Sequence, residues 1–121
     1  MGRRERRRGR LRAPEVPYAD AYGNALVLRG SIRAGARASY ATIASGAALR
    51  PGETREDAWH RAVEFLFEQL AVSWEIAGTE PLKRQEELLA RFRVATAAER
   101  GWVRETLRAH CAEHFPDIAP P

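Results

Sequence analysis

The chain has 121 residues and a mass of 13.6 kDa, the size of one ordinary domain and too short for two. Its formal charge of +4 is unevenly spread: residues 1–12 hold seven arginines and one glutamate, whereas residues 13–121 hold 13 basic and 15 acidic groups, a net of −2. A single cysteine excludes an intramolecular disulfide, and no apolar run reaches the roughly 18–20 residues of a membrane span. No apolar stretch follows the basic start as in a secretory signal, so we expect a cytoplasmic, non-membrane protein.

The first segment, residues 1–17, combines like charges with glycine and proline and is expected to be disordered on its own. Two interpretations stay open: a solvated tail, or an electrostatic arm whose guanidinium groups bind phosphates or an acidic protein. The arm would consist of Arg3, Arg4, Arg6, Arg7, Arg8, Arg10 and Arg12. It would bind nucleic acid without reading its sequence, with an affinity that falls steeply as salt rises.

A short β element is predicted next. Residues 25–28 form a brief apolar run, and Gly23-Asn24 before them are turn formers. Residues 18–22 supply a weaker first strand, so the pattern predicts a β-hairpin or a single strand. A lone hairpin is unstable in water, so this element must pack on helices or pair with another chain.

Helical periodicity dominates the rest of the sequence. Residues 34–50 predict a short helix of low intrinsic stability, because alanine, serine and glycine bury little area. The principal helix is predicted over residues 54–77, opened by a capping box at Thr54 and Asp57 and ended by Gly78. Its apolar stripe consists of Trp59, Val63, Leu66, Leu70, Trp74 and Ala77.

Two more helices are predicted near the C-terminus. One follows Pro81 and buries leucines and Phe92; the other opens with a second capping box at Thr96 and Glu99 and ends at Pro116. The fold class is therefore mainly α (α+β): a small bundle of three to four helices with a short N-terminal β-hairpin or strand. One domain is expected over residues 18–116, between the tail at 1–17 and a frayed C-terminus at 117–121.

Reactive side chains do not form a recognisable catalytic or metal-binding pattern. His110 and His114 share one helical face at the spacing of helical zinc ligands, but Cys111 between them points elsewhere, and no HExxH pattern is present. Cys111 lies on an apolar stripe, where a thiol is normally an inert small hydrophobe. The glycines match neither of the two common phosphate-binding motifs, GxxxxGK(S/T) and GxGxxG. We therefore expect a non-enzymatic protein without a metal or cofactor.

The predicted principal helix has more apolar surface than one neighbour can cover. Phe65, Leu66 and Phe67 point in three directions, so a partner or a second copy is expected to cover part of it, although an ordinary core is the alternative explanation. The strand edge also invites another chain. The predicted partner-binding residues are Leu26, Val27, Leu28, Phe65, Phe67 and Trp74. Trp59 and Trp74 are expected to be buried, and Phe67 to matter more for association than for stability.

The order of these features resembles the tail assembly chaperones of long-tailed, siphophage-type bacteriophages. The resemblance covers residues 23–116, through the stretches GNALVLRGSI, REDAWHRAVEFLFEQLAVSWEIAG and LKRQEELLARFRVATAAERGWVRETLRAHCAEHFPD. It implies a small, helical, non-enzymatic protein of the host cytoplasm that binds the tape measure protein and helps recruit tail tube subunits. The family has no invariant ligand motif, so no functional residue is transferred. The alternative is a small nucleic-acid-associated protein that uses the basic N-terminal arm.

Overall fold

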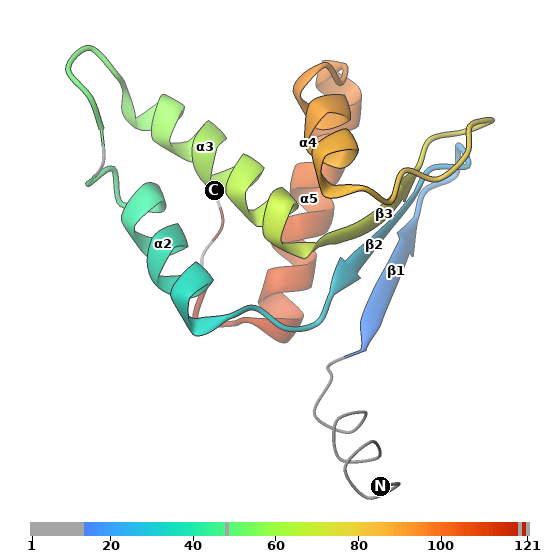
Figure 1. Ribbon diagram of the computed structural model, residues 1–121, viewed down its shortest axis with the longest axis horizontal. Helices are drawn as coiled ribbons and strands as arrows, with labels where there is room; N and C mark the ends of the chain where they lie inside the picture. The colour runs from blue at the N-terminus through green and yellow to red at the C-terminus, as the bar shows by residue number, and fades with distance from the viewer. Residues whose placement is uncertain (1–13, 48, 119, 121) are drawn as a thin grey trace, which may run out of the picture.

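The fold is a mixed α+β structure in which a small antiparallel sheet packs against helices (Figure 1). The computed structural model describes residues 14–47, 49–118 and 120. Within these ranges the elements are β1 (Glu15–Ala19), β2 (Ala25–Arg29), α2 (Ala34–Ala44), α3 (Arg55–Leu70), β3 (Ala71–Glu75), α4 (Gln85–Arg93) and α5 (Ala97–His114). The predicted α+β class is right in outline, but a three-stranded sheet replaces the expected hairpin.

The sheet has the order β1-β2-β3 with both pairings antiparallel, so β2 is its central strand. Leu26 lies opposite Tyr18 of β1 and Trp74 of β3, and this row faces the core. Val27 and its neighbours in the next row face the other way, because side chains alternate across a strand. Figure 1 shows α4 and α5 beside the sheet, with α2 and α3 forming an open V at the far side.

The N-terminal boundary was predicted too late in the sequence. β1 begins at Glu15, inside the segment expected to be disordered, and ends at Ala19 instead of continuing to residue 22. Pairing with β2 explains the difference, since the local sequence alone offers little strand signal.

A five-residue turn joins these two strands. The Asp20 carboxylate accepts hydrogen bonds from the backbone N–H of Tyr22 at 2.8 Å and of Asn24 at 3.0 Å. Gly23 takes a φ of +84°, which glycine adopts without strain. Gly23-Asn24 therefore belongs to the hairpin turn, as the sequence predicted.

The predicted long helix over residues 54–77 is wrong in its second half. α3 ends at Leu70, and the chain passes without a loop into β3, which pairs with β2. The apolar spacing of Leu70 and Trp74 fits a helix, but the valine and tryptophan of this segment also favour a strand. Tertiary pairing decides between the two, and it places β2 in the middle of the sheet instead of at its edge.

α3 contributes the centre of the core. Phe67 is fully buried, stacks on Phe92 with ring centroids 4.7 Å apart, and meets Trp74 edge-on at 5.6 Å. Trp59 is 44% exposed instead of buried, because it lies on the first turns of α3, away from the sheet. The burial expected of Trp59 is therefore wrong, and Phe67 is a core residue instead of a surface one.

The helix predicted over residues 34–50 ends early, at Ala44, where Gly46 takes a φ of +79° that does not continue a helix. The other helix ends are close to the predicted ones. Both capping boxes are confirmed, at Thr54 with Asp57 and at Thr96 with Glu99. α4 begins later than expected, at Gln85, because Leu82 exchanges two backbone hydrogen bonds with Trp74 of β3.

The C-terminus does not fray at residue 117 as predicted. Asp117 forms an ion pair with Arg37 of α2, and the guanidinium of Arg37 also lies over the ring of Phe115. Ile118 is 8% exposed and belongs to the core. The last helix and its extension therefore hold α2 in place.

Replacing Phe67 with alanine is expected to lower the free energy of unfolding by about 3–5 kcal/mol, since it removes a fully buried ring from the core. Trp59→Ala, the matched aromatic truncation on the same helix, should cost about 1 kcal/mol or less. Urea unfolding followed by circular dichroism measures both. A larger loss for Trp59→Ala than for Phe67→Ala would mean that α3 is rotated about its axis.

Candidate functional site

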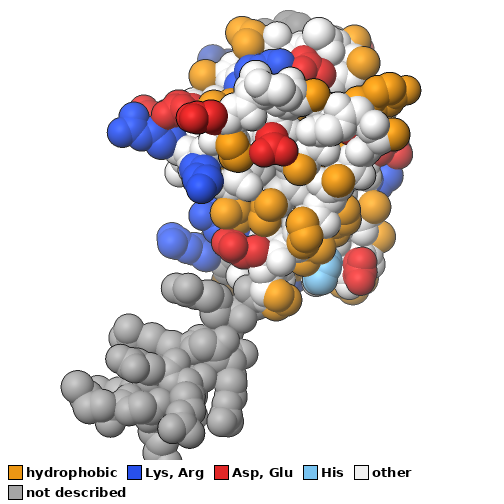
Figure 2. Space-filling view, turned by 90° about the vertical axis from the view of Figure 1, so that its right-hand side faces the viewer, with side chains coloured by type: hydrophobic (Ala, Val, Ile, Leu, Met, Phe, Trp, Pro, Cys, Tyr) orange, Lys and Arg blue, Asp and Glu red, His pale blue; other side chains and the backbone are white. Residues whose placement is uncertain are grey.

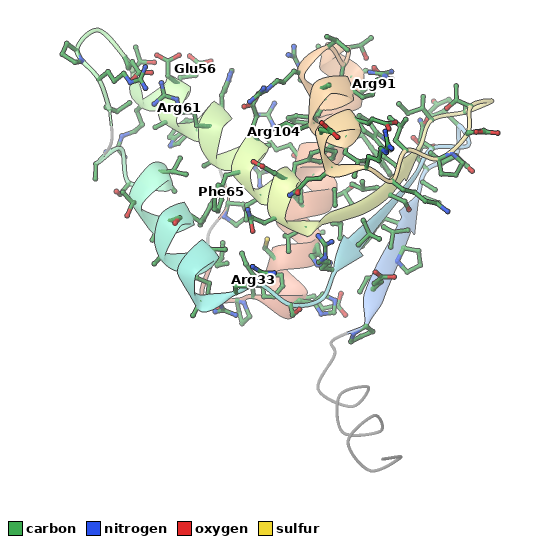
Figure 3. All side chains as sticks on the ribbon, viewed as in Figure 1. Arg33, Glu56, Arg61, Phe65, Arg91 and Arg104 are labelled. Carbon is green, nitrogen blue, oxygen red and sulfur yellow. The ribbon has the colours of Figure 1, made fainter. Side chains whose placement is uncertain are left out.

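The residues predicted to bind a partner lie mostly in the core. Leu26, Leu28 and Phe67 are 0% exposed and Trp74 is 1% exposed, so none of them offers a docking surface. The prediction fails for these residues because it assumed an edge strand and an unpartnered helix. Val27 and Phe65 are half-buried, and Phe65 lies between α2 and α3 (Figure 3). Among the predicted residues, Val27 alone lies on the face of the sheet that points away from the core.

The predicted electrostatic arm falls outside the described residues. All of its arginines precede residue 14: Arg3, Arg4, Arg6, Arg7, Arg8, Arg10 and Arg12. Its role stays a prediction from the sequence.

The first candidate surface is the outer face of the sheet, defined as the face turned away from the core. Its central row consists of Pro17, Val27 and Ser73. One flanking row consists of Ala19, Ala25 and Glu75, and the other contains Glu15 and Arg29, so the face is partly apolar and partly charged. These side chains are exposed or half-buried, in contrast to the fully buried leucines of the inner face. In Figure 2, which views the molecule from the side where the sheet lies, hydrophobic and acidic side chains are interspersed over the centre and basic ones gather mainly at the left margin.

The second candidate surface is a groove between α3, α4 and α5, with a volume of about 190 Å³. Its apolar floor is formed by Val63 and Phe92, which are 9% and 4% exposed. The floor is rigid, because Phe92 stacks on Phe67 in the core. A ligand in this groove would therefore contact buried apolar atoms below and exposed guanidinium groups above.

The rim of the groove is basic. α4 contributes Arg93, whose Nε lies 3.4 Å from the Glu64 carboxylate of α3. α5 contributes Arg100 and Arg104, and neither guanidinium has a hydrogen bond or ion pair to any residue that the structure describes. Arg104 extends from α5 toward α3 (Figure 3). His60 completes the rim from α3, in a long, exposed contact of 3.9 Å with Glu56.

The corner between α4 and α5 holds this rim in place. Glu99 accepts the Thr96 backbone N–H at 2.8 Å and the Arg91 guanidinium at 2.7 Å. The hydrogen bond from Thr96, together with Arg91, lowers the pKa of the Glu99 carboxyl. Glu99 therefore caps α5 and ties it to α4 through one ionised side chain.

The groove was missed in the sequence because three separated elements build it. Arg100 and Arg104 stand four residues apart on α5, at the border of its buried face and each one turn before a buried residue, Val103 and Leu107. The spacing of these two arginines, just after the capping box, is the one signal in the sequence that indicates a basic strip on this helix. What the spacing does not reveal is that α3 and α4 supply the opposite wall.

A hydrogen-bonded link through the buried His110 connects α5 to the sheet. His110 of α5 donates its Nε2–H to the carbonyl of Arg29 at 2.7 Å, and its Nδ1 accepts from the Tyr18 hydroxyl at 2.7 Å. Because a carbonyl oxygen can only accept a hydrogen bond, the neutral ring must carry its proton on Nε2, which leaves Nδ1 as the acceptor. Burial raises the pKa of the neighbouring Cys111 thiol to about 11, so this thiol stays protonated at neutral pH. The two hydrogen bonds of His110 thus join α5 to β1 and β2.

Other kinds of site find little support in the described part of the chain. Across its residues, no three His, Cys, Asp or Glu side chains gather closely enough to hold a metal ion. The helices described are each too short or too polar to cross a bilayer. No family model, curated protein or solved structure matches the chain. The outer face of the sheet and the groove between α3, α4 and α5 are therefore the candidate binding sites in the described part of the chain.

The His110 link is expected to make stability depend on pH. Burial is the main cause that lowers the pKa of His110 below its ordinary 6.5, with His114 acting in the same direction against the Arg29 carbonyl and Glu113. The unfolded chain therefore takes up a proton below about pH 6.5 while the folded chain resists it. Stability should be full above pH 6.5 and fall as pH drops from there toward the lower folded pKa.

Urea unfolding between pH 8 and pH 5 measures this effect, in a range above the titration of ordinary carboxyl groups. Replacing the exposed His60 with glutamine should leave the slope unchanged, whereas His110→Gln should flatten it. If His110→Gln does not fold, an NMR titration of the His110 ring in the unmodified protein replaces it. A His110 pKa at or above 6.5 would contradict the prediction.

Proposed function

We propose that the protein is a non-enzymatic tail assembly chaperone of a long-tailed bacteriophage. In this role it works in the host cytoplasm, binds the tape measure protein before assembly, and helps recruit tail tube subunits. The proposal combines the sequence resemblance over residues 23–116 with a surface suited to holding another protein chain.

The outer face of the sheet is the observation that supports the proposal. Its central row pairs Pro17 with Val27 and Val27 with Ser73, and these side chains are exposed or half-buried. The apolar part of this face, Pro17 and Val27 with Ala19 and Ala25, gains free energy when another chain covers it, while Glu15, Arg29 and Glu75 lie around it. The inner face of the sheet already carries the core and the link to His110, so a partner that docks on the sheet uses its outer face.

Docking by the face is favoured over strand addition at the edge of β1. The Asp20 N–H bonds to the Asn24 carbonyl and the Gly30 N–H to the Pro14 carbonyl, which fixes the alternation of the β1–β2 ladder. Pro17 therefore turns its backbone outward at the middle of the free edge, where it has no N–H to donate. The edge is blunted, and partner recognition must rely on side chains.

The alternative function, binding nucleic acid, is favoured by the seven arginines within residues 1–12. The rest of the chain carries a net charge of −2, whereas a docked nucleic-acid-binding face is expected to be basic. The two functions differ in salt dependence. Contacts to phosphates weaken steeply with salt, and apolar contacts do not.

The test co-expresses the full chain with a tape measure protein from the same genome and measures co-purification at low and physiological salt. We expect the two proteins to remain together at both salt concentrations. Val27→Lys should lower the amount retained about tenfold or more, because it places a charge in the apolar contact.

Val94→Lys is the matched control, since Val94 is 77% exposed and lies at the end of α4, away from the sheet. This variant should retain the partner, and both variants should keep the thermal stability of the unmodified chain within a few degrees. Recovery of nucleic acid alone, lost at the higher salt, would overturn the chaperone proposal and support the alternative.

A further inference from the structure

We propose that the groove between α3, α4 and α5 binds a carboxylate side chain presented by an apolar helical segment of the partner protein. This inference rests on the proposed function only in taking the occupant to be a partner protein. It assigns a binding role to Arg100 and Arg104, which the resemblance to a family does not provide.

The size of the groove selects a side chain over a cofactor. Its volume of about 190 Å³ is below the roughly 300–1,000 Å³ of pockets that enclose small molecules. The floor of Val63 and Phe92 provides apolar contact for an aliphatic stem. A glutamate or aspartate beside a leucine on a partner helix would place its stem on this floor and its charge at the rim.

Charge complementarity selects a carboxylate. The groove has Arg93, Arg100 and Arg104 on its rim against one acidic lining residue, Glu64, which Arg93 already contacts at 3.4 Å. Arg100 and Arg104 lack any partner among the described residues, so their donors are free for a ligand. Two guanidinium groups one helical turn apart can bracket a single carboxylate with several charge-assisted hydrogen bonds.

The surroundings argue against a nucleic acid at this site. The groove is short, since its lining residues lie within a few turns of α3, α4 and α5. A nucleic-acid-binding groove follows a line of phosphates over several nucleotides. Here the free guanidinium groups are confined to two neighbouring turns of α5.

The experiment uses the full chain and two synthetic helical peptides with the same leucine stripe. One peptide carries glutamates beside the stripe, and the other carries glutamines at those positions. NMR signals of the arginine Nε–H groups and fluorescence anisotropy report binding. We expect the glutamate peptide to bind and shift the signals of Arg100 and Arg104, with affinity at least about tenfold above the glutamine peptide.

The double variant Arg100→Gln/Arg104→Gln should lower this affinity about tenfold or more, without changing thermal stability. Arg108→Gln is the matched control, because Arg108 lies one turn further along α5, outside the groove, and pairs with Glu105 at 3.2 Å. It should bind the glutamate peptide like the unmodified chain. Equal binding of both peptides, or an unchanged affinity in the double variant, would overturn the inference.

A single-stranded oligonucleotide and inorganic phosphate are tested in the same assay. If either shifts the Arg100 and Arg104 signals and the glutamate peptide does not, the site is not one for a carboxylate. The test also separates this inference from the chaperone proposal. If the double arginine variant still retains the tape measure protein and Val27→Lys loses it, the chaperone proposal is supported and the role of the groove is rejected.

Discussion

The structure depends on the antiparallel pairing of β3 with β2. Because α3 ends at Leu70 and β3 begins at Ala71, this pairing fixes the direction of the main helix against the sheet without an adjustable loop. It also changes an unstable two-stranded hairpin into a sheet with a covered inner face. Trp74 then meets Phe67 in the core and, through its backbone, positions Leu82 and the start of α4. Two of the three helices that form the groove, α3 and α4, thus take their places from this pairing.

The remaining constraint is a polar one. His110 fixes α5 against the other two strands of the sheet: it hydrogen-bonds to the Tyr18 hydroxyl of β1 and to the Arg29 carbonyl of β2. Buried polar groups are costly when unpaired, so these two bonds specify one position of α5 along β1 and β2. The same helix carries Arg100 and Arg104 near its other end. A side chain that looked like a metal ligand in the sequence therefore sets where the basic rim lies.

Local signals in the sequence predicted most of the elements but not how they assemble. The two capping boxes, the short helix before Pro51 and the strand at residues 25–28 are specified by neighbouring residues, and all of them are found. β3 was missed because the spacing of Leu70 and Trp74 fits both a helix and a buried strand, and only its distant partner decides. That error made Leu26 and Leu28 look like edge residues and Phe67 like a surface residue. The groove was missed for a similar reason, since it joins residues of α3, α4 and α5 that no single period connects.

The two surfaces together fit a protein that holds its partner temporarily. Five-residue strands with a rise of about 3.3 Å and a spacing of about 4.8 Å give the outer face of the sheet an area of roughly 200 Å². A stable complex typically buries about 800 Å² on each partner, so this face alone does not provide a permanent interface. The groove adds charged contacts at its rim, and such contacts contribute more to orientation and to the rate of encounter than to lifetime. In the proposed chaperone function, a weakly held partner would be released to the tighter contacts of an assembling tube of subunits.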